Sequence, residues 1–222
     1  MGETRDAGPF VPGNAELPEL REASAGCRGC ALYERATRTV FGEGPAGARL
    51  VLVGEQPGDQ EDRQGRPFVG PAGRLLGRAL EEAEIERDAV YVTNAVKHFK
   101  FTLKEGSKRR FHQSPGTTEI NACRPWLVAE LEAVSPEVVV ALGAVAGKAL
   151  LGPSFRVTRQ RGVPLDCPPF EAIGAPAAAA QGPPAGRIVA TIHPSAVLRA
   201  PDRDAVYAGL VSDLRVAARL LG

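Results

Sequence analysis

The sequence has few cysteines, no long apolar run and almost no net charge. Four cysteines in 222 residues are too few for a secreted protein held together by many disulfide bonds. No stretch of about 18 consecutive apolar residues occurs, so we expect no transmembrane helix and no membrane partner. The 27 Lys and Arg balance 26 Asp and Glu, so net charge alone does not indicate a nucleic-acid-binding protein.

Several short signals are also missing. The first residues, Met-Gly-Glu-Thr-Arg-Asp, lack the basic and apolar regions of a signal peptide, and we expect a cytoplasmic protein. No phosphate-loop or dinucleotide-binding motif occurs, so ATP and NAD are not expected as ligands. The length and the 44% hydrophobic content predict an N-terminal arm over residues 1–20 and one globular domain over residues 21–222. Nothing indicates an obligate oligomer, so we expect a monomer.

Short apolar runs alternate with segments of helical periodicity. Strands are predicted at residues 49–53, 90–94, 138–142 and 187–192, and helices at residues 72–84, 118–134, 144–151 and 203–221. This alternation predicts an α/β fold with three α/β/α layers and a central, mostly parallel four-stranded sheet. Residues 168–186, rich in Pro, Ala and Gly, are expected to form a surface loop. Ligands bind at the carboxyl ends of the strands in such folds.

The loop after the first predicted strand is rich in carboxylates. Gly54 lets the backbone approach a ligand. Glu55 and Asp59 lie nearest the strand end, where a carboxylate can activate water, orient a nucleophile or stabilise a developing cation. Glu61 and Asp62 are expected to be solvated.

A strongly basic segment follows the second predicted strand. Residues 97–110 hold six Lys and Arg against one Glu, interleaved with Phe99 and Phe101 and followed by Phe111. Cations that follow phosphates and aromatic faces that stack on bases are typical of a nucleic-acid groove. The alternative is a solvated lysine loop over partly buried phenylalanines. The position at the carboxyl edge of the sheet favours the nucleic-acid interpretation.

Two histidines lie at chemically favourable positions. His112 follows Arg109 and Arg110, whose charges favour a neutral imidazole that can act as a nucleophile or base. His193 ends the fourth strand, where it can donate to a leaving group while Ser195 caps the following turn. The alternatives are a solvated loop histidine and a structural histidine.

The four cysteines allow a metal centre. Cys27 and Cys30 form a C-x₂-C pair, whereas Cys123 and Cys167 stand alone. Four thiolates can hold either a zinc ion or an iron–sulfur cluster, and ligand count does not separate the two. The alternative is two buried apolar cysteines and an unrelated C-x₂-C turn.

Several motifs carry a family resemblance together with these cysteines: Gly54-Glu-Gln-Pro-Gly58, Arg66-Pro-Phe68-Val-Gly-Pro-Ala-Gly73, Thr93-Asn94 and His193-Pro-Ser195. They resemble the iron–sulfur uracil-DNA glycosylases of family 4, from about residue 27 to residue 221. Two departures from that family, Gln56 and the stretch Lys108-Arg-Arg-Phe-His112, are similar to the type-X uracil-DNA glycosylases, whose loop usually reads Lys-Arg-Arg-Ile-His.

The resemblance implies a base-excision site acting on uracil-containing DNA, with single strands preferred because extruding the base then costs least. It implies that the four cysteines hold a structural [4Fe–4S] cluster. Phe68 would stack on the extruded uracil, Asn94 would read its Watson–Crick edge, and His193 would stabilise the departing uracilate. The carboxylates Glu55 and Asp59, with Gln56, would line the site near the sugar.

The type-X resemblance implies that His112 attacks the sugar C1′ cation left as uracil departs, which gives a covalent protein–DNA product and one turnover. Arg109 and Arg110 would hold the loop and nearby phosphates, and Glu55 would activate or orient His112. Two other hypotheses remain open. One is an ordinary multi-turnover family 4 glycosylase, and the other is a non-catalytic nucleic-acid-binding protein stiffened by a metal centre.

Overall fold

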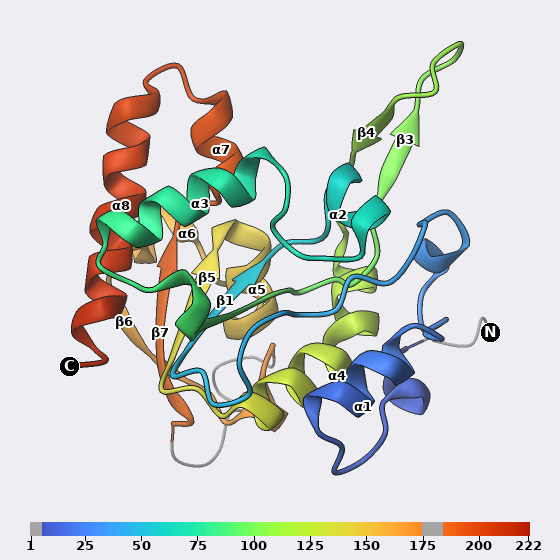
Figure 1. Ribbon diagram of the computed structural model, residues 1–222, viewed down its shortest axis with the longest axis horizontal. Helices are drawn as coiled ribbons and strands as arrows, with labels where there is room; N and C mark the ends of the chain where they lie inside the picture. The colour runs from blue at the N-terminus through green and yellow to red at the C-terminus, as the bar shows by residue number, and fades with distance from the viewer. Residues whose placement is uncertain (1–5, 175–183) are drawn as a thin grey trace.

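A computed structural model describes residues 6–174 and 184–222, in which a central sheet is covered by helices on both faces (Figure 1). The sheet has five strands in the order β2-β1-β5-β7-β6. Their bounds are β1 Leu50–Gly54, β2 Val90–Asn94, β5 Val138–Leu142, β6 Pro164–Cys167 and β7 Gly186–Thr191. The first four strands in that order are parallel, and β6 runs antiparallel to β7. The predicted three-layer, mostly parallel architecture is confirmed.

The predicted number of four strands is wrong, because β6 adds a fifth. The four predicted strands are all present, since each is a continuous apolar run buried on both faces. Strand β6 has no such run and is only partly buried. It lies at the edge of the sheet and begins with Pro164, a residue that an edge strand tolerates.

Eight α-helices occur in the described ranges. They are α1 Leu17–Ser24, α2 Asp59–Gln64, α3 Pro71–Glu82, α4 Thr117–Val134, α5 Gly143–Leu151, α6 Val157–Gln160, α7 Pro194–Arg199 and α8 Arg203–Arg219. The four predicted helices correspond to α3, α4, α5 and α8. None of these helices is long and apolar enough to cross a membrane, a finding that covers residues 6–174 and 184–222 only.

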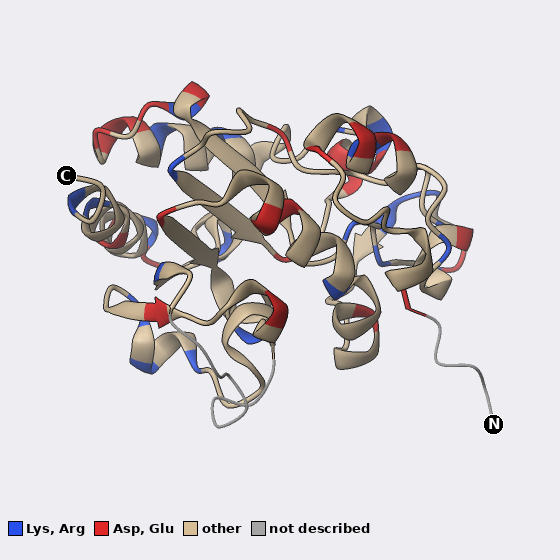
Figure 2. Cartoon of the chain, turned by 90° about the horizontal axis from the view of Figure 1, so that it is seen from below, with Lys and Arg blue, Asp and Glu red and all other residues tan. Residues whose placement is uncertain are grey.

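The core forms two apolar layers, one on each face of the sheet. One layer joins β1 and β5 to α4 and α5 and contains the fully buried Trp126. The other layer joins the same strands to α3 and α8 through residues such as Leu80 and Leu210. In Figure 2 the strands at the centre carry almost no charged residues, which lie mainly on the surrounding helices and loops.

The N-terminal segment does not separate from the domain at residue 20. Helix α1 crosses that boundary, and the Ala7 amide donates to the Ala122 carbonyl of α4 at 2.8 Å. Ala7 and Leu20 are buried in the layer that contains α4. The described residues before α1 therefore pack on the domain rather than extending from it as an arm.

The basic segment after β2 forms a hairpin rather than an irregular loop. Strands β3 (Phe101–Leu103) and β4 (Arg110–His112) pair antiparallel, with Phe101 opposite His112. Figure 1 shows this hairpin projecting from the body of the molecule. Of the expected surface loop at residues 168–186, the described part includes one short 3₁₀ turn, Phe170–Ala172, and residues 175–183 lie outside the description.

An ion pair is buried between the sheet and α4. The Lys97 ammonium lies within hydrogen-bonding distance of the Glu130 carboxylate, and the two side chains are each about 1% exposed. The Glu130 carboxylate also accepts three hydrogen bonds, from the Tyr91 hydroxyl at 2.9 Å, the Thr93 hydroxyl at 2.9 Å and the Gly42 amide at 2.8 Å. A buried ion pair is tolerated when all its hydrogen bonds are made. Removal of one partner leaves an uncompensated charge in the interior, which lowers the free energy of unfolding.

We predict that Glu130→Ala lowers the free energy of unfolding by about 3–5 kcal/mol, because it leaves the Lys97 ammonium buried without its partner. Urea denaturation at pH 7 measures this loss. The matched control is Glu137→Ala, which breaks an exposed pair with Arg49 and should have a much smaller effect. Equal losses in the two variants would contradict the role assigned to the buried pair.

Candidate active site

A cavity of about 660 Å³ opens at the carboxyl ends of the strands, where the fold predicts a ligand. It is bordered by the loops after β1, β2 and β7, by the base of the hairpin and by the start of α3. Its lining includes Glu55, Gln56, Asp59, Phe68, Asn94, His112, Ser114, His193, Ser195, Leu198 and Arg199. The structure thus brings together side chains from five separate segments. Most of the residues singled out in the sequence are among them.

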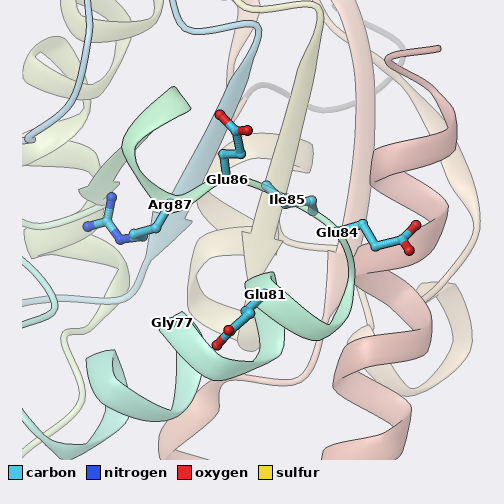
Figure 3. A pocket seen from close by; sticks show the side chains of 6 residues that line it. All are labelled: Gly77, Glu81, Glu84, Ile85, Glu86 and Arg87. Carbon is cyan, nitrogen blue, oxygen red and sulfur yellow. The ribbon is translucent and has the colours of Figure 1, made fainter.

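A second cavity lies near the start of β2, at the opposite end of that strand. Figure 3 shows Glu81, Glu84 and Glu86 around it, with Arg87 as the only Lys or Arg among its described lining residues. Its described lining has no aromatic ring, imidazole or carboxamide that could stack on or pair with a base, whereas the cavity at the carboxyl ends of the strands has Phe68, Asn94 and His193. The cavity at the carboxyl ends of the strands is therefore the better candidate for a DNA site.

Gly54 makes room for the two side chains expected to bind a base. A Cβ atom at Gly54 would lie 2.3 Å from the Asn94 Oδ1 atom and 2.7 Å from the Phe68 ring. Both distances are too short for a non-bonded contact, so only glycine fits at this position. Asn94 stands opposite Gly54 in the β1–β2 register. Its carboxamide makes no hydrogen bond within residues 6–174 and 184–222, so it is available to a ligand.

His193 is held in one tautomer. It caps the start of α7, and its Nδ1 atom accepts a hydrogen bond from the Ser195 amide at 3.1 Å. Since Nδ1 is an acceptor, the ring proton of the neutral imidazole must lie on Nε2. Burial, aided by the charge of Arg199, lowers the pKa of His193 to about 4. At neutral pH this side chain is therefore an uncharged N–H donor, and its ring lies 6.5 Å from the Phe68 ring.

Glu55 and His112 face each other across the cavity. The His112 Nε2 atom lies 3.8 Å from Glu55 Oε1. That oxygen is buried and has no hydrogen-bond partner in the described part of the chain. A buried carboxylate oxygen without a donor is costly unless a ligand or a transition state supplies a positive charge.

Gln56 fixes the base of the hairpin. Its carboxamide donates to the carbonyls of Lys100 at 3.2 Å and Gln113 at 3.0 Å, and it accepts from the Lys100 amide at 3.1 Å. These contacts occupy the two residues that flank the hairpin strands. Gln56 borders the cavity, but its polar atoms are engaged by the main chain that carries His112.

Arg110 ties the hairpin to α2. Its side chain is 10% exposed and forms ion pairs with Asp59 and with Asp62, the latter at 2.6 Å. Burial disfavours the charge on Asp59, but hydrogen bonds from Arg63 and Arg110 outweigh it and hold the pKa of Asp59 below its usual value. Arg110 is thus committed to carboxylates of the protein.

The expectation that Glu61 and Asp62 are solvated is wrong. Glu61 is 9% exposed and Asp62 is fully buried. The Glu61 carboxylate accepts hydrogen bonds from the amides of Gly70 at 2.7 Å and Gly58 at 3.1 Å. Asp62 binds Arg110 and the Thr37 amide. Main-chain amides of nearby turns make burial of Glu61 possible, and partners 25 and 48 positions away do so for Asp62.

Arg109 lies on the exposed side of the hairpin and is free of acidic partners in the described residues. Its guanidinium lies 5.3 Å from the centre of the Phe111 ring, and Lys104 Nζ lies 4.7 Å from the same centre. The two cations and the ring form an exposed surface suited to a phosphate backbone.

None of the four cysteines forms a disulfide bond, and all four are buried. Cys27, Cys123 and Cys167 lie in the same apolar layer. The Trp126 indole donates to Cys27 Sγ at 3.1 Å, and the Lys97 amide donates to Cys123 Sγ at 3.2 Å. Such donors are typical of sulfurs that ligate iron. Within residues 6–174 and 184–222, no three His, Cys, Asp or Glu side chains are grouped as the ligands of a single metal ion.

Burial raises the pKa of both Cys123 and Cys167 to about 12. Thiolates at these positions would therefore need a positively charged group beside them. Each of the four sulfurs is buried and two of them accept N–H hydrogen bonds, so their donor chemistry fits an iron–sulfur cluster.

Sequence reasoning missed three lining residues, Ser114, Leu198 and Arg199. They follow the recognised motifs by only a few positions, but no motif or local charge pattern includes them. No local signal in the sequence indicates the environment of His98. It is buried, with its Nε2 atom 2.9 Å from the Thr39 hydroxyl, and burial lowers its pKa to about 4.

Comparison with known proteins is consistent with this site. The sequence profile described as "Uracil DNA glycosylase superfamily" matches residues 41–215. A type-4 uracil-DNA glycosylase of Thermotoga maritima is 37% identical over 186 residues, covering 83% of this chain and 84% of that protein. The type-4 enzyme of Pyrobaculum aerophilum is 34% identical over 190 residues, covering 84% and 86%. That of Sulfurisphaera tokodaii is 36% identical over 151 residues, covering 66% and 64%.

We predict that stability falls as pH decreases from about 6.5 to about 4. In this range the unfolded chain protonates His98 and His193, whereas the folded chain keeps both neutral, so acid favours unfolding. Between these pH values His98 lowers the free energy of unfolding by on the order of 3 kcal/mol, and the His98→Gln variant should lack this decrease. Urea denaturation of both proteins at pH 7, 6, 5 and 4.5 measures the difference. Parallel pH profiles would show that His98 titrates normally in the folded protein.

Proposed function

The chain belongs to the uracil-DNA glycosylase superfamily, and from this premise we propose that it excises uracil and then retains the abasic sugar covalently through His112. The observation that carries the proposal is the short distance between the His112 imidazole and the Glu55 carboxylate. The carboxylate oxygen is buried and unpartnered, 3.8 Å from the imidazole Nε2 atom, in the cavity that also contains Phe68, Asn94 and His193.

Binding begins with extrusion of the uridine from the strand. Phe68 stacks on the uracil ring, and the Asn94 carboxamide pairs with its Watson–Crick edge, accepting from N3–H and donating to O4. Gly54 is required because any larger residue would displace both side chains. Single-stranded DNA is the preferred substrate, since no base pair has to be broken.

The leaving group departs as an anion. As the bond between C1′ and N1 of uracil breaks, both electrons go to the base. Negative charge then develops on O2, and the Nε2–H of His193 donates to this oxygen. The lowered pKa keeps His193 neutral, and because its Nδ1 accepts from the Ser195 amide, its single ring proton lies on Nε2 and can be donated to this oxygen.

Capture of the sugar follows. The Glu55 carboxylate stabilises the positive charge at C1′, and a ring nitrogen of neutral His112 forms a bond to that carbon with its lone pair. The resulting imidazolium loses its N–H proton, to Glu55 or to solvent, and a neutral glycosyl imidazole remains. Water does not displace it, so each protein molecule acts once.

The surrounding residues position the nucleophile. Gln56 and Arg110 hold the hairpin that carries His112, the former through the main chain and the latter through Asp59. Because Arg110 is paired inside the protein, we assign phosphate contacts on the hairpin to Arg109. Ser195 fixes the tautomer of His193.

The four cysteines are proposed to hold a [4Fe–4S] cluster in a monomeric, cytoplasmic protein. Cys27 and Cys30 come from one segment, whereas Cys123 comes from α4 and Cys167 from β6. When bound, the cluster cross-links these segments and takes no part in the chemistry. The buried sulfurs and the N–H donors to Cys27 and Cys123 support this assignment.

An ordinary multi-turnover glycosylase is the second candidate. It is favoured by the relatives, which carry the name type-4 uracil-DNA glycosylase at 34–37% identity. In that case water attacks C1′, and His112 is a residue of the hairpin without a chemical role.

We predict that wild-type protein and uracil-containing single-stranded DNA form a product that survives boiling in detergent on a denaturing gel. His112→Ala should lose this band, because the other imidazole among the described lining residues, His193, has its Nδ1 lone pair engaged by the Ser195 amide and its proton on Nε2. Thr102→Ala, an exposed change on the same hairpin, is the matched control and should keep it. Persistence of the band in His112→Ala would exclude His112 as the nucleophile. Uracil release over many turnovers without a band would favour the second candidate.

We predict that protein purified without oxygen is brown and contains about four iron and four sulfide ions per chain. Cys123→Ser should lose iron and lower the midpoint of thermal unfolding, because one of the four ligands is gone. Iron and sulfide assays with a thermal melt measure both effects. A colourless wild-type protein that contains zinc would overturn the cluster assignment.

A further inference from the structure

Phe68 has a main-chain conformation that residues other than glycine rarely adopt. Its φ is 56°, in the left-handed region. Such a conformation persists only where the surrounding contacts hold it. The ring is half-buried against the apolar layer of α3 and α8, and it borders the cavity. The contacts of the main chain around Phe68 therefore determine where the ring lies.

Two contacts fix the turn that follows Phe68. The chain passes so close to the start of α3 that a Cβ atom at Gly73 would lie 1.7 Å from the Phe68 carbonyl oxygen. The Gly70 amide, two residues after Phe68, donates to the Glu61 carboxylate at 2.7 Å. The first contact is local, whereas the second joins this turn to another helix, α2. The place of Phe68 is thereby related to the position of α2.

The Glu61 carboxylate joins the starts of two helices. Its second oxygen accepts from the Gly58 amide at 3.1 Å, and Gly58 and Gly70 are the N-cap residues of α2 and α3. Cβ atoms at Gly58 and Gly70 would lie 2.6 Å and 3.0 Å from the Glu61 oxygens, so both glycines leave room for the carboxylate. Hydrogen bonds from amides to a carboxylate are stronger than those between neutral groups.

Helix α2 is also the anchor of the hairpin. Asp59 and Asp62 of this helix bind Arg110 of β4. Glu61, which lies between these two aspartates in the sequence, therefore relates the turn of Phe68 to the hairpin that carries His112. A ring that stacks on uracil and a nucleophile that attacks the sugar must lie at a fixed distance from each other.

We propose that Glu61 is a positioning residue that holds the Phe68 ring in its stacking position through the main chain of Gly70. The inference rests on the proposed function, since it explains how one substrate contact of the same site is fixed. Both carboxylate oxygens are engaged by amides, so Glu61 acts through Phe68 and not on the substrate. Without the carboxylate, the turn relaxes toward an ordinary φ and the ring leaves the plane in which it stacks.

The test measures single-turnover release of uracil from a single-stranded oligonucleotide at subsaturating protein. Glu61→Gln keeps the size of the side chain, but only one of its two terminal atoms can accept a hydrogen bond from an amide. It should lower the rate by roughly 10-fold, the effect of losing one hydrogen bond to a charged group. The matched control is Glu19→Gln, the same change at the third position of α1, where Glu19 accepts from the Glu16 amide at 3.1 Å. It should leave the rate unchanged.

The decisive comparison introduces Glu61→Gln together with Phe68→Leu, which keeps an apolar side chain and removes the stacking ring. In this background Glu61→Gln should have little further effect, because the ring that it positions is gone. A merely structural role of Glu61 would lower the rate by the same factor in both backgrounds. Thermal melts of all variants show whether each is folded at the temperature of the assay.

Gly70→Ala tests the same contact if Glu61→Gln does not fold. The main chain of Gly70, with φ −81° and ψ −170°, suits alanine, and the added Cβ would lie 3.0 Å from Glu61 Oε1 and displace it slightly. The rate should fall in the wild-type background and not in the Phe68→Leu background. A methyl group that obstructed the substrate directly would lower the rate in both.

Two results overturn the inference alone. One is that wild type releases uracil and Glu61→Gln behaves like Glu19→Gln. The other is that Glu61→Gln, or Gly70→Ala in its place, loses as much in the Phe68→Leu background as in wild type. If wild type releases no uracil from any substrate, the proposed function itself fails, and the role of Glu61 fails with it.

Discussion

The position of His112 depends on one interaction, the insertion of the Arg110 side chain between Asp59 and Asp62 of α2. A hairpin with three residues in each strand is not stable on its own, because two short strands bury too little surface. Arg110 anchors the hairpin by forming an ion pair with Asp62, which is fully buried. Gln56 adds hydrogen bonds at the base. The geometry between His112 and Glu55 is therefore determined by contacts that are not themselves part of the chemistry.

The site has two parts, one formed by residues at the ends of the sheet strands and one supplied by the hairpin. Gly54, Asn94 and His193 lie at or just beyond the ends of sheet strands, whose positions are set by ladder hydrogen bonds and by apolar layers on both faces. His112 is supplied by a hairpin that projects from this scaffold (Figure 1). Under the proposed function, residues at the ends of the sheet strands recognise the base. His112 on the hairpin determines whether the sugar is retained covalently.

The sequence allowed prediction where the signal was local. Strands such as β1 and β5 are continuous apolar runs, and the loops after β1, β2 and β7 border the cavity, whereas the loop after β5 is not among its described lining residues. Strand β6 was missed because a short, half-exposed edge strand has no distinctive pattern. The burial of Asp62 was missed because its partner lies 48 positions away in the sequence. The resemblance to known glycosylases supplied the roles of the site residues, and these stay predictions.

Lys97 contacts both the end of β2 and the buried sulfur of Cys123 on α4. Its ammonium donates to the Asn94 carbonyl at 2.7 Å, and its amide donates to Cys123 Sγ at 3.2 Å. Oxidation of that sulfur to a sulfinic or sulfonic acid would bring charged oxygens against the Lys97 main chain. Because the ammonium of the same residue holds the Asn94 carbonyl, a displacement of the Lys97 main chain by such oxygens would also move the end of β2 that carries Asn94.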